Sequence, residues 1–128
     1  MGGEGARPLT GLDVLLVEDE TLISLLIEDM LADLGAREVR YAGHLDAALA
    51  LVEERRPDVA LLDVNLAGEL VFALAEKLEG FGVPFLFITG YGRAGFAGRW
   101  AEREVIQKPF TFEVLAQALT KVLALARG

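Results

Sequence analysis

The sequence predicts an α/β domain in which a five-stranded parallel sheet is doubly wound, with helices on both faces. Short apolar runs alternate five times along the chain with amphipathic runs whose apolar residues recur every three to four positions. The runs at 59–62 and 85–88 show no polar alternation, which is expected of strands buried on both faces. Five strand-then-helix units imply right-handed crossovers and a parallel sheet covered by helices on both faces.

Composition narrows the class of protein further. The chain has 128 residues, a hydrophobic content of 53%, no cysteine and a net charge of −8. This length fits one domain with a sizeable core, and the negative charge argues against binding nucleic acid. The absence of cysteine excludes disulfides, thiolate metal sites and a cysteine nucleophile. Because no apolar run approaches the length of a membrane span or a signal core, we expect no membrane insertion and a cytoplasmic location.

The elements can be placed in order along the chain. Residues 1–10 are glycine-rich and are expected to form a flexible lead-in to one domain at 11–127. An apolar run at 12–17 predicts the first strand, and a helix follows from Glu20 until Gly35 stops it. The later elements are strands at 38–42, 59–63, 85–89 and 104–107 and helices at 45–55, 69–78 and 111–126, the last with Thr111 as N-cap.

Polar residues stand where four of these strands end. Glu18-Asp19 follows the first strand, Asp63 ends the third, Thr89 ends the fourth and Lys108 follows the fifth. Each alone has an ordinary structural explanation, such as a helix N-terminus, a turn or a solvated surface. Doubly wound sheets bind ligands at the carboxyl ends of their strands, so the conjunction predicts a site there.

These residue types suit one kind of chemistry. Converging carboxylates repel each other unless a cation lies among them, and Mg²⁺ prefers oxygen ligands. With such an ion present, Asp63 could act as a nucleophile toward phosphorus. The Lys108 ammonium and the Thr89 hydroxyl would then stabilise charge on the transferring oxygens.

The motifs that carry this pattern are Leu15-Leu16-Val17-Glu18-Asp19-Glu20, Leu61-Leu62-Asp63-Val64-Asn65-Leu66, Thr89-Gly90 and Gln107-Lys108-Pro109-Phe110. Together they resemble the receiver domain of two-component response regulators. The resemblance implies a flavodoxin-like sheet of order 2-1-3-4-5 and a cis bond at Lys108-Pro109. It also implies functional roles: phosphoacceptor for Asp63, switch hydroxyl for Thr89, phosphoryl-pairing cation for Lys108, and Mg²⁺ ligands for Glu18, Asp19, Asp63 and the backbone carbonyl of Asn65.

The same resemblance implies the partners. A histidine kinase or phosphotransfer protein would donate the phosphoryl group, and the protein would bind an unidentified output protein or act as a phosphoryl sink. Such a domain is not an enzyme beyond its own phosphorylation and dephosphorylation. No output domain follows residue 126, so the expected form is a stand-alone receiver.

Two departures from the common family pattern affect the expected switch. The fifth strand carries Val105 where an aromatic is usual, and Ala67-Gly68 replaces the usual proline after the phosphoacceptor. The Thr-Gly-Tyr sequence at 89–91 instead resembles the FAT GUY subgroup of receivers. Tyr91 is therefore expected to take over the switch, with an ordinary half-exposed aromatic as the alternative. Four glycines at 90–98 predict that any helix there is short or frayed, and that phosphorylation reorders it.

Other interpretations stay open from the sequence. The chain could be a degenerate receiver that serves as a docking module without phosphorylation. A phosphatase acting through an aspartyl phosphate is disfavoured because the second acid that such enzymes generally use is replaced by Asn65. Trp100 and Phe96 could form a partner surface or pack locally, and His44 is expected to be a loop or cap residue.

Overall fold

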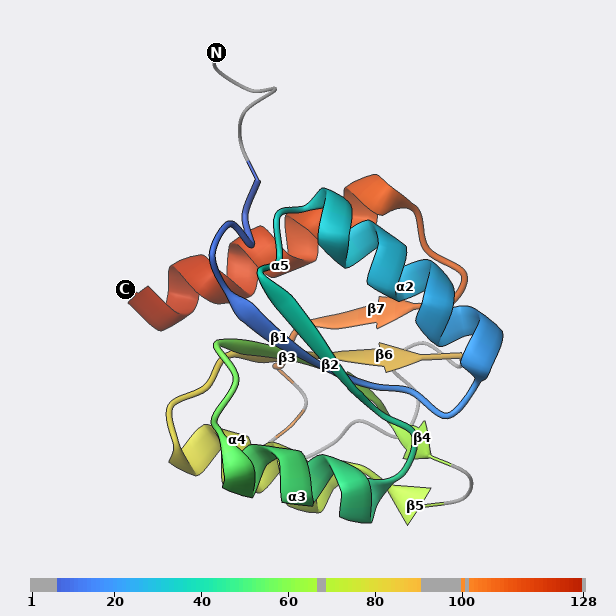
Figure 1. Ribbon diagram of the computed structural model, residues 1–128, viewed down its shortest axis with the longest axis vertical. Helices are drawn as coiled ribbons and strands as arrows, with labels where there is room; N and C mark the ends of the chain where they lie inside the picture. Colours follow the sequence, from blue (N-terminus) through green and yellow to red (C-terminus); the bar gives the residue numbers. More distant parts are fainter. Residues whose placement is uncertain (1–6, 67–68, 91–99, 101, 128) are drawn as a thin grey trace.

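A computed structural model of the chain describes residues 7–66, 69–90, 100 and 102–127. Five strands form one parallel sheet, confirming the predicted fold class and the order 2-1-3-4-5 (Figure 1). In spatial order, the strands are β2 (Glu38–Ala42), β1 (Asp13–Val17), β3 (Val59–Asp63), β6 (Phe85–Thr89) and β7 (Val105–Gln107).

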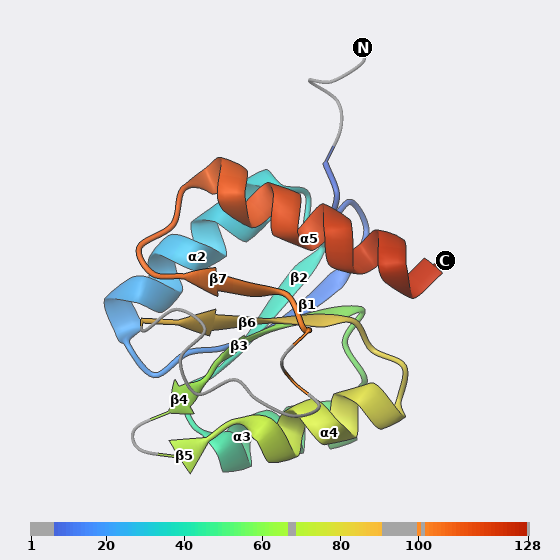
Figure 2. The same ribbon diagram turned by 180° about the vertical axis from the view of Figure 1, so that it is seen from behind.

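Helices cover the two faces of the sheet in pairs (Figures 1 and 2). One face carries α2 (Thr21–Asp33) and α5 (Phe112–Arg127), and the other carries α3 (Leu45–Glu54) and α4 (Phe72–Gly80). Alternate residues of β1 enter the two cores: Val14 packs with the first pair and Leu15 with the second. This double burial explains why the strands lack polar alternation. No helix in the described part of the chain has the length and apolarity needed to cross a bilayer.

Local signals fix the ends of several helices as expected. The Nδ1 of His44 accepts a hydrogen bond from the Ala47 N–H at 3.3 Å, so His44 is the N-cap of α3. Thr111 Oγ1 accepts from the Val114 N–H at 3.1 Å at the start of α5. After α2, Gly35 adopts a φ of 101°, a conformation that side chains with a Cβ rarely adopt.

The expected helix at 69–78 begins later than predicted. A short antiparallel hairpin, β4 (Asn65–Leu66) and β5 (Glu69–Leu70), comes directly after β3, and α4 begins at Phe72. The Val71 N–H donates to the Val64 carbonyl at 3.1 Å, which holds the chain back against the end of β3. The backbone groups at 69–70 therefore pair across the hairpin, so the helix begins beyond them.

The chain before β1 also differs from the expected loose lead-in. Leu9 is fully buried in the core on the α2 and α5 side, and its N–H donates to the Leu34 carbonyl at 3.0 Å. Thr10 and Ala36 form an isolated antiparallel bridge. The flexible lead-in predicted for 1–10 is therefore wrong at its end, because Leu9 supplies apolar surface to the core; residues 1–6 lie outside the described residues.

Trp100 belongs to the core rather than to an exposed surface. Its ring stacks on Phe72 with centroids 5.7 Å apart and meets Phe85 and Phe87 edge-on at 6.2 and 5.8 Å. Of the two readings open from the sequence, local packing is therefore confirmed for Trp100. Phe96, Tyr91 and most of the glycine-rich stretch lie outside the described residues, so the expected switch at Tyr91 stays a prediction.

Candidate functional site

Three predicted site residues contact one another at the carboxyl end of the sheet. Glu18 follows β1 and is fully buried, Asp63 ends β3 with 5% exposure, and Lys108 follows β7. The Lys108 Nζ lies 3.2 Å from Glu18 Oε1 and 3.4 Å from Asp63 Oδ2. Because β1 and β3 are neighbours in the sheet, the two acids lie on adjacent strand ends and share this ammonium.

Backbone hydrogen bonds hold these positions. The Glu18 N–H donates to the Ala42 carbonyl at 3.1 Å, and the Lys108 N–H donates to the Thr89 carbonyl at 2.8 Å. The Lys108-Pro109 peptide bond is cis, as the family resemblance implied. Both ends of the charged contact are therefore attached directly to the sheet.

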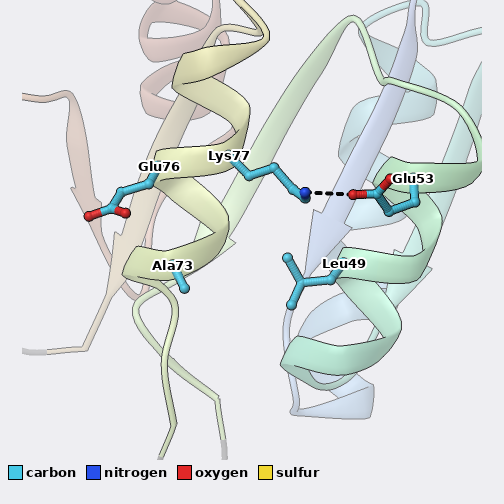
Figure 3. Close-up of a pocket in the computed structure, with 5 residues that line it drawn as sticks. All are labelled: Leu49, Glu53, Ala73, Glu76 and Lys77. Atoms are coloured by element: carbon cyan, nitrogen blue, oxygen red, sulfur yellow. Dashed lines mark ion pairs between the residues drawn. The ribbon is translucent and has the colours of Figure 1, made fainter.

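Two further predicted residues, Thr89 and Asn65, lie near Asp63 in the sheet or in the chain. Thr89 ends β6, is buried, and lies at the same sheet edge because Asp63 is in register with Ile88. Asn65 begins β4, two residues after Asp63, which keeps its backbone close to Asp63 in the chain. The pocket between α3 and α4 lies elsewhere: its lining residues belong only to these two helices, and the ion pair of Glu53 with Lys77 crosses it at 2.5 Å (Figure 3).

Glu20 is a member of the site that the sequence analysis did not assign. Its Oε1 lies 3.1 Å from the Lys108 Nζ, and its N–H donates to Glu18 Oε2 at 3.0 Å. Carboxylate oxygens of Glu18, Asp19 and Glu20 lie within 4.8 Å of one another. An acid at a helix N-terminus is usually explained by the helix dipole, and only its continuity with the acidic pair could have indicated this role.

The charges of the site shift its proton equilibria. Burial raises the pKa of Glu18 to about 7; the hydrogen bond from the Glu20 backbone lowers it, the charge and hydrogen bonding of Asp63 raise it, and Lys108 lowers it. For Lys108, burial lowers the pKa, but the charges of Asp63 and Glu18 outweigh this effect and raise the pKa above its usual value. Lys108 therefore stays protonated, while Glu18 is partly protonated near neutral pH.

The donor set fits a hard divalent cation. Glu18, Asp19 and Asp63 offer only carboxylate oxygens, which suit Mg²⁺. Burial is the main cause of the raised pKa of Glu18, and the negative charge of Asp63 raises it further even with Lys108 beside both acids. A further positive charge at this edge would relieve the repulsion between Glu18 and Asp63.

We expect the unfolding free energy of the metal-free protein to fall between about pH 5 and pH 8 because of Glu18. A group whose pKa is raised by folding stabilises the fold below its unfolded pKa of 4.5, and this stabilisation is lost as the pH rises through about 7. The Glu18→Gln variant lacks this titration, so it should gain on the order of 2 kcal/mol relative to wild type over that range. Urea denaturation in a chelator at both pH values measures the difference. Glu54→Gln, an exposed change of the same charge, serves as the control; parallel pH profiles for wild type and Glu18→Gln would contradict the expectation.

Comparisons with known proteins show the family and the fold of the chain. The family model of the response regulator receiver domain matches residues 14–120. The solution structure of SdrG from Sphingomonas melonis Fr1 is similar at a TM-score of 0.79 with 41% identity, covering 91% of this chain and 98% of that one.

Two curated relatives show the same family in proteins of different length. The nitrogen assimilation regulatory protein NtrX of Azorhizobium caulinodans is 34% identical over 122 residues, covering 90% of this chain and 27% of NtrX. The probable chemotaxis protein CheY of Rhizobium etli is 25% identical over 125 residues, covering 85% of this chain and 90% of CheY. The chain thus spans about a quarter of one relative and most of the other. Since the family match runs from β1 into α5 and includes every predicted site residue, the chain belongs to the response regulator receiver domain family.

Proposed function

We propose that this receiver domain accepts a phosphoryl group on Asp63 from a histidine kinase or a phosphotransfer protein, and signals by binding an output protein or acts as a phosphoryl sink. The observation that carries the proposal is the contact of Lys108 with both Asp63 and Glu18 at the carboxyl edge of the sheet. A buried acid beside a fixed ammonium provides a nucleophile and a partner for phosphoryl oxygens in one place.

The transfer itself needs little more than this arrangement. An Asp63 oxygen forms a bond to phosphorus while the bond from phosphorus to the donor nitrogen or oxygen breaks, and the leaving atom keeps the electron pair and takes a proton from solvent. The Lys108 ammonium and the Thr89 hydroxyl then pair with phosphoryl oxygens. Glu18, Asp19, Asp63 and the Asn65 carbonyl would hold Mg²⁺, whose charge offsets the repulsion between these acids and the phosphoryl oxygens.

The single-domain form and the switch belong to the same proposal. The extent of the matches to SdrG and CheY, nearly the full length of each, supports a receiver that works as one unit. The Thr-Gly-Tyr sequence at 89–91 and the small Val105 support a switch of the FAT GUY type, in which Tyr91 replaces the missing aromatic. Val105 packs partly buried on the same core as Phe87 and Trp100, so that core face already holds aromatic side chains.

The test is incubation with acetyl phosphate and Mg²⁺, followed by intact-mass measurement. We expect a single added phosphoryl group in wild type and none in Asp63→Ala. An unmodified wild-type protein, with acetyl phosphate and with a phosphorylated histidine phosphotransfer protein alike, would instead favour the docking module that is never phosphorylated.

A further inference from the structure

The Lys108 ammonium has as many acidic partners as it has hydrogens. A lysine ammonium carries three N–H donors. Within the described part of the chain, its Nζ lies 3.1 Å from Glu20 Oε1, 3.2 Å from Glu18 Oε1 and 3.4 Å from Asp63 Oδ2. Any new acceptor, such as a phosphoryl oxygen, must therefore displace one of these carboxylates.

The three carboxylates differ in how easily they can be released. The Glu18 side chain is fully buried and that of Asp63 is 6% exposed, whereas the Glu20 side chain is 63% exposed. Separating a buried acid from its cation leaves an uncompensated charge in the interior, which is costly. Water solvates the exposed Glu20 carboxylate when it separates from Lys108, and an exposed ion pair contributes little to stability. Glu20 is therefore the contact that breaks most easily.

The position of Glu20 leaves its carboxylate available for this contact. It is the N-cap residue of α2, yet its side chain makes no capping hydrogen bond, unlike that of His44 at α3. Its N–H donates to Glu18 Oε2, so the backbone at this position is fixed to the site. The side chain thus reaches across to Lys108 from a backbone anchored beside Glu18.

We propose that Glu20 is a positioning residue whose carboxylate tethers Lys108 in the unphosphorylated protein. When Asp63 is phosphorylated, a phosphoryl oxygen replaces the Glu20 carboxylate as a partner of Lys108. This inference rests on the proposed phosphorylation of Asp63. The tether stabilises the unphosphorylated state, so it opposes the transfer step. Hydrolysis starts from the phosphorylated protein: water bonds to phosphorus, and the bond from phosphorus to Asp63 breaks. The contact between Glu20 and Lys108 is already broken in the phosphorylated protein and stays broken during hydrolysis, so it does not affect the hydrolysis rate.

The test compares the rate of phosphorylation of Asp63 with the rate at which the phosphorylated protein is hydrolysed. With acetyl phosphate and saturating Mg²⁺, the bond from Asp63 to phosphorus forms and acetate leaves with the electron pair of the broken bond. We expect Glu20→Gln to accelerate this step about two- to fivefold, the range of an exposed ion pair, and to leave the hydrolysis rate unchanged. Intact-mass time courses measure both rates, and the Mg²⁺ dependence of the first reports any change in metal affinity.

A second variant separates the tether from simple charge repulsion. Glu20→Asp keeps the negative charge at the rim but withdraws the carboxylate from Lys108 by one methylene, so it should be phosphorylated as fast as Glu20→Gln. If Glu20→Asp instead behaves like wild type, repulsion of the donor explains the effect and the tether is wrong.

Controls connect the effect to Lys108. Glu54→Gln removes the same charge at an exposed position near the end of α3 and should react like wild type. In a Lys108→Ala background, Glu20→Gln should have no effect, since the tethered group is gone. The gain from Glu20→Gln should also shrink at 1 M salt, because salt screens an exposed pair.

The remaining outcomes are distinct. Equal phosphorylation rates for Glu20→Gln and wild type would overturn the tether while leaving phosphorylation of Asp63 established. Slower phosphorylation with a raised Mg²⁺ requirement would overturn it as well and would make Glu20 a metal ligand. Failure of wild type to be phosphorylated at all would remove the proposed function itself.

Discussion

Asp19→Asn is expected to abolish phosphorylation of Asp63 while leaving the fold intact. Asp19 is only half-buried, and its carboxylate lies with those of Glu18 and Glu20 in a cluster of acidic oxygens. An amide in its place removes one of the charges that attract a divalent ion and keeps the volume of the side chain. Since the proposed transfer depends on positive charge at this edge, the loss should be at least 100-fold or about 3 kcal/mol in the barrier.

The measurement is the rate of phosphorylation by acetyl phosphate over a range of Mg²⁺ concentrations. Asp29→Asn makes the same chemical change on the exposed side of α2 and should react like wild type. Urea denaturation of both variants checks that the fold is retained. Phosphorylation of Asp19→Asn at the wild-type rate would show that the proposed metal ligands are wrong.

The strands were predictable because their burial leaves a direct trace in the sequence. In β3 and β6 each residue before the last enters the core on one face or the other, which requires a continuous apolar run. The order of the strands then followed from the resemblance and is confirmed. The hairpin at 65–70 left no such trace: two strands of two residues each are too short for a period to appear, and they depend on pairing across the hairpin.

The site was predictable to the extent that strand ends define it. Glu18 and Lys108 come directly after strands and Asp63 is the last residue of one, so a parallel sheet brings them to one edge. Glu20 was missed because its role depends on the side-chain reach of Lys108 from β7, a contact between residues 88 positions apart. Nothing in the local sequence distinguishes such an acid from one favoured by the helix dipole.

Two core residues were hidden by the glycines around them. Leu9 stands in a glycine-rich segment, and Trp100 follows four glycines, so neither belongs to a periodic apolar pattern. Both are nevertheless buried, Leu9 at 0% and Trp100 at 7% exposure. Their burial depends on tertiary packing, which the periodicity of neighbouring residues in the sequence does not reveal.

Trp100→Ala is expected to remove a large part of the stability of this domain. The ring contacts three phenylalanines, from β6 and α4, and the guanidinium of Arg103 lies 4.7 Å from the Phe85 ring centroid in the same cluster. Truncating a buried tryptophan loses the transfer free energy of the indole and leaves a cavity, a combined cost of about 3–5 kcal/mol. Small domains have a total stability of about 5–15 kcal/mol, so the variant should be marginally folded.

Urea denaturation followed by far-ultraviolet circular dichroism measures this effect without relying on the fluorescence of the residue removed. Phe112→Ala, which truncates a 38% exposed aromatic at the start of α5, is the matched control and should cost no more than about 1 kcal/mol. Trp100→Phe keeps an aromatic ring against Phe72 and should retain most of the stability. A Trp100→Ala variant as stable as Phe112→Ala would mean that the aromatic cluster contributes little. In that case the core on the α4 side of the sheet packs well without the Trp100 ring, and its stability comes from the aliphatic contacts between β3, β6 and the helices.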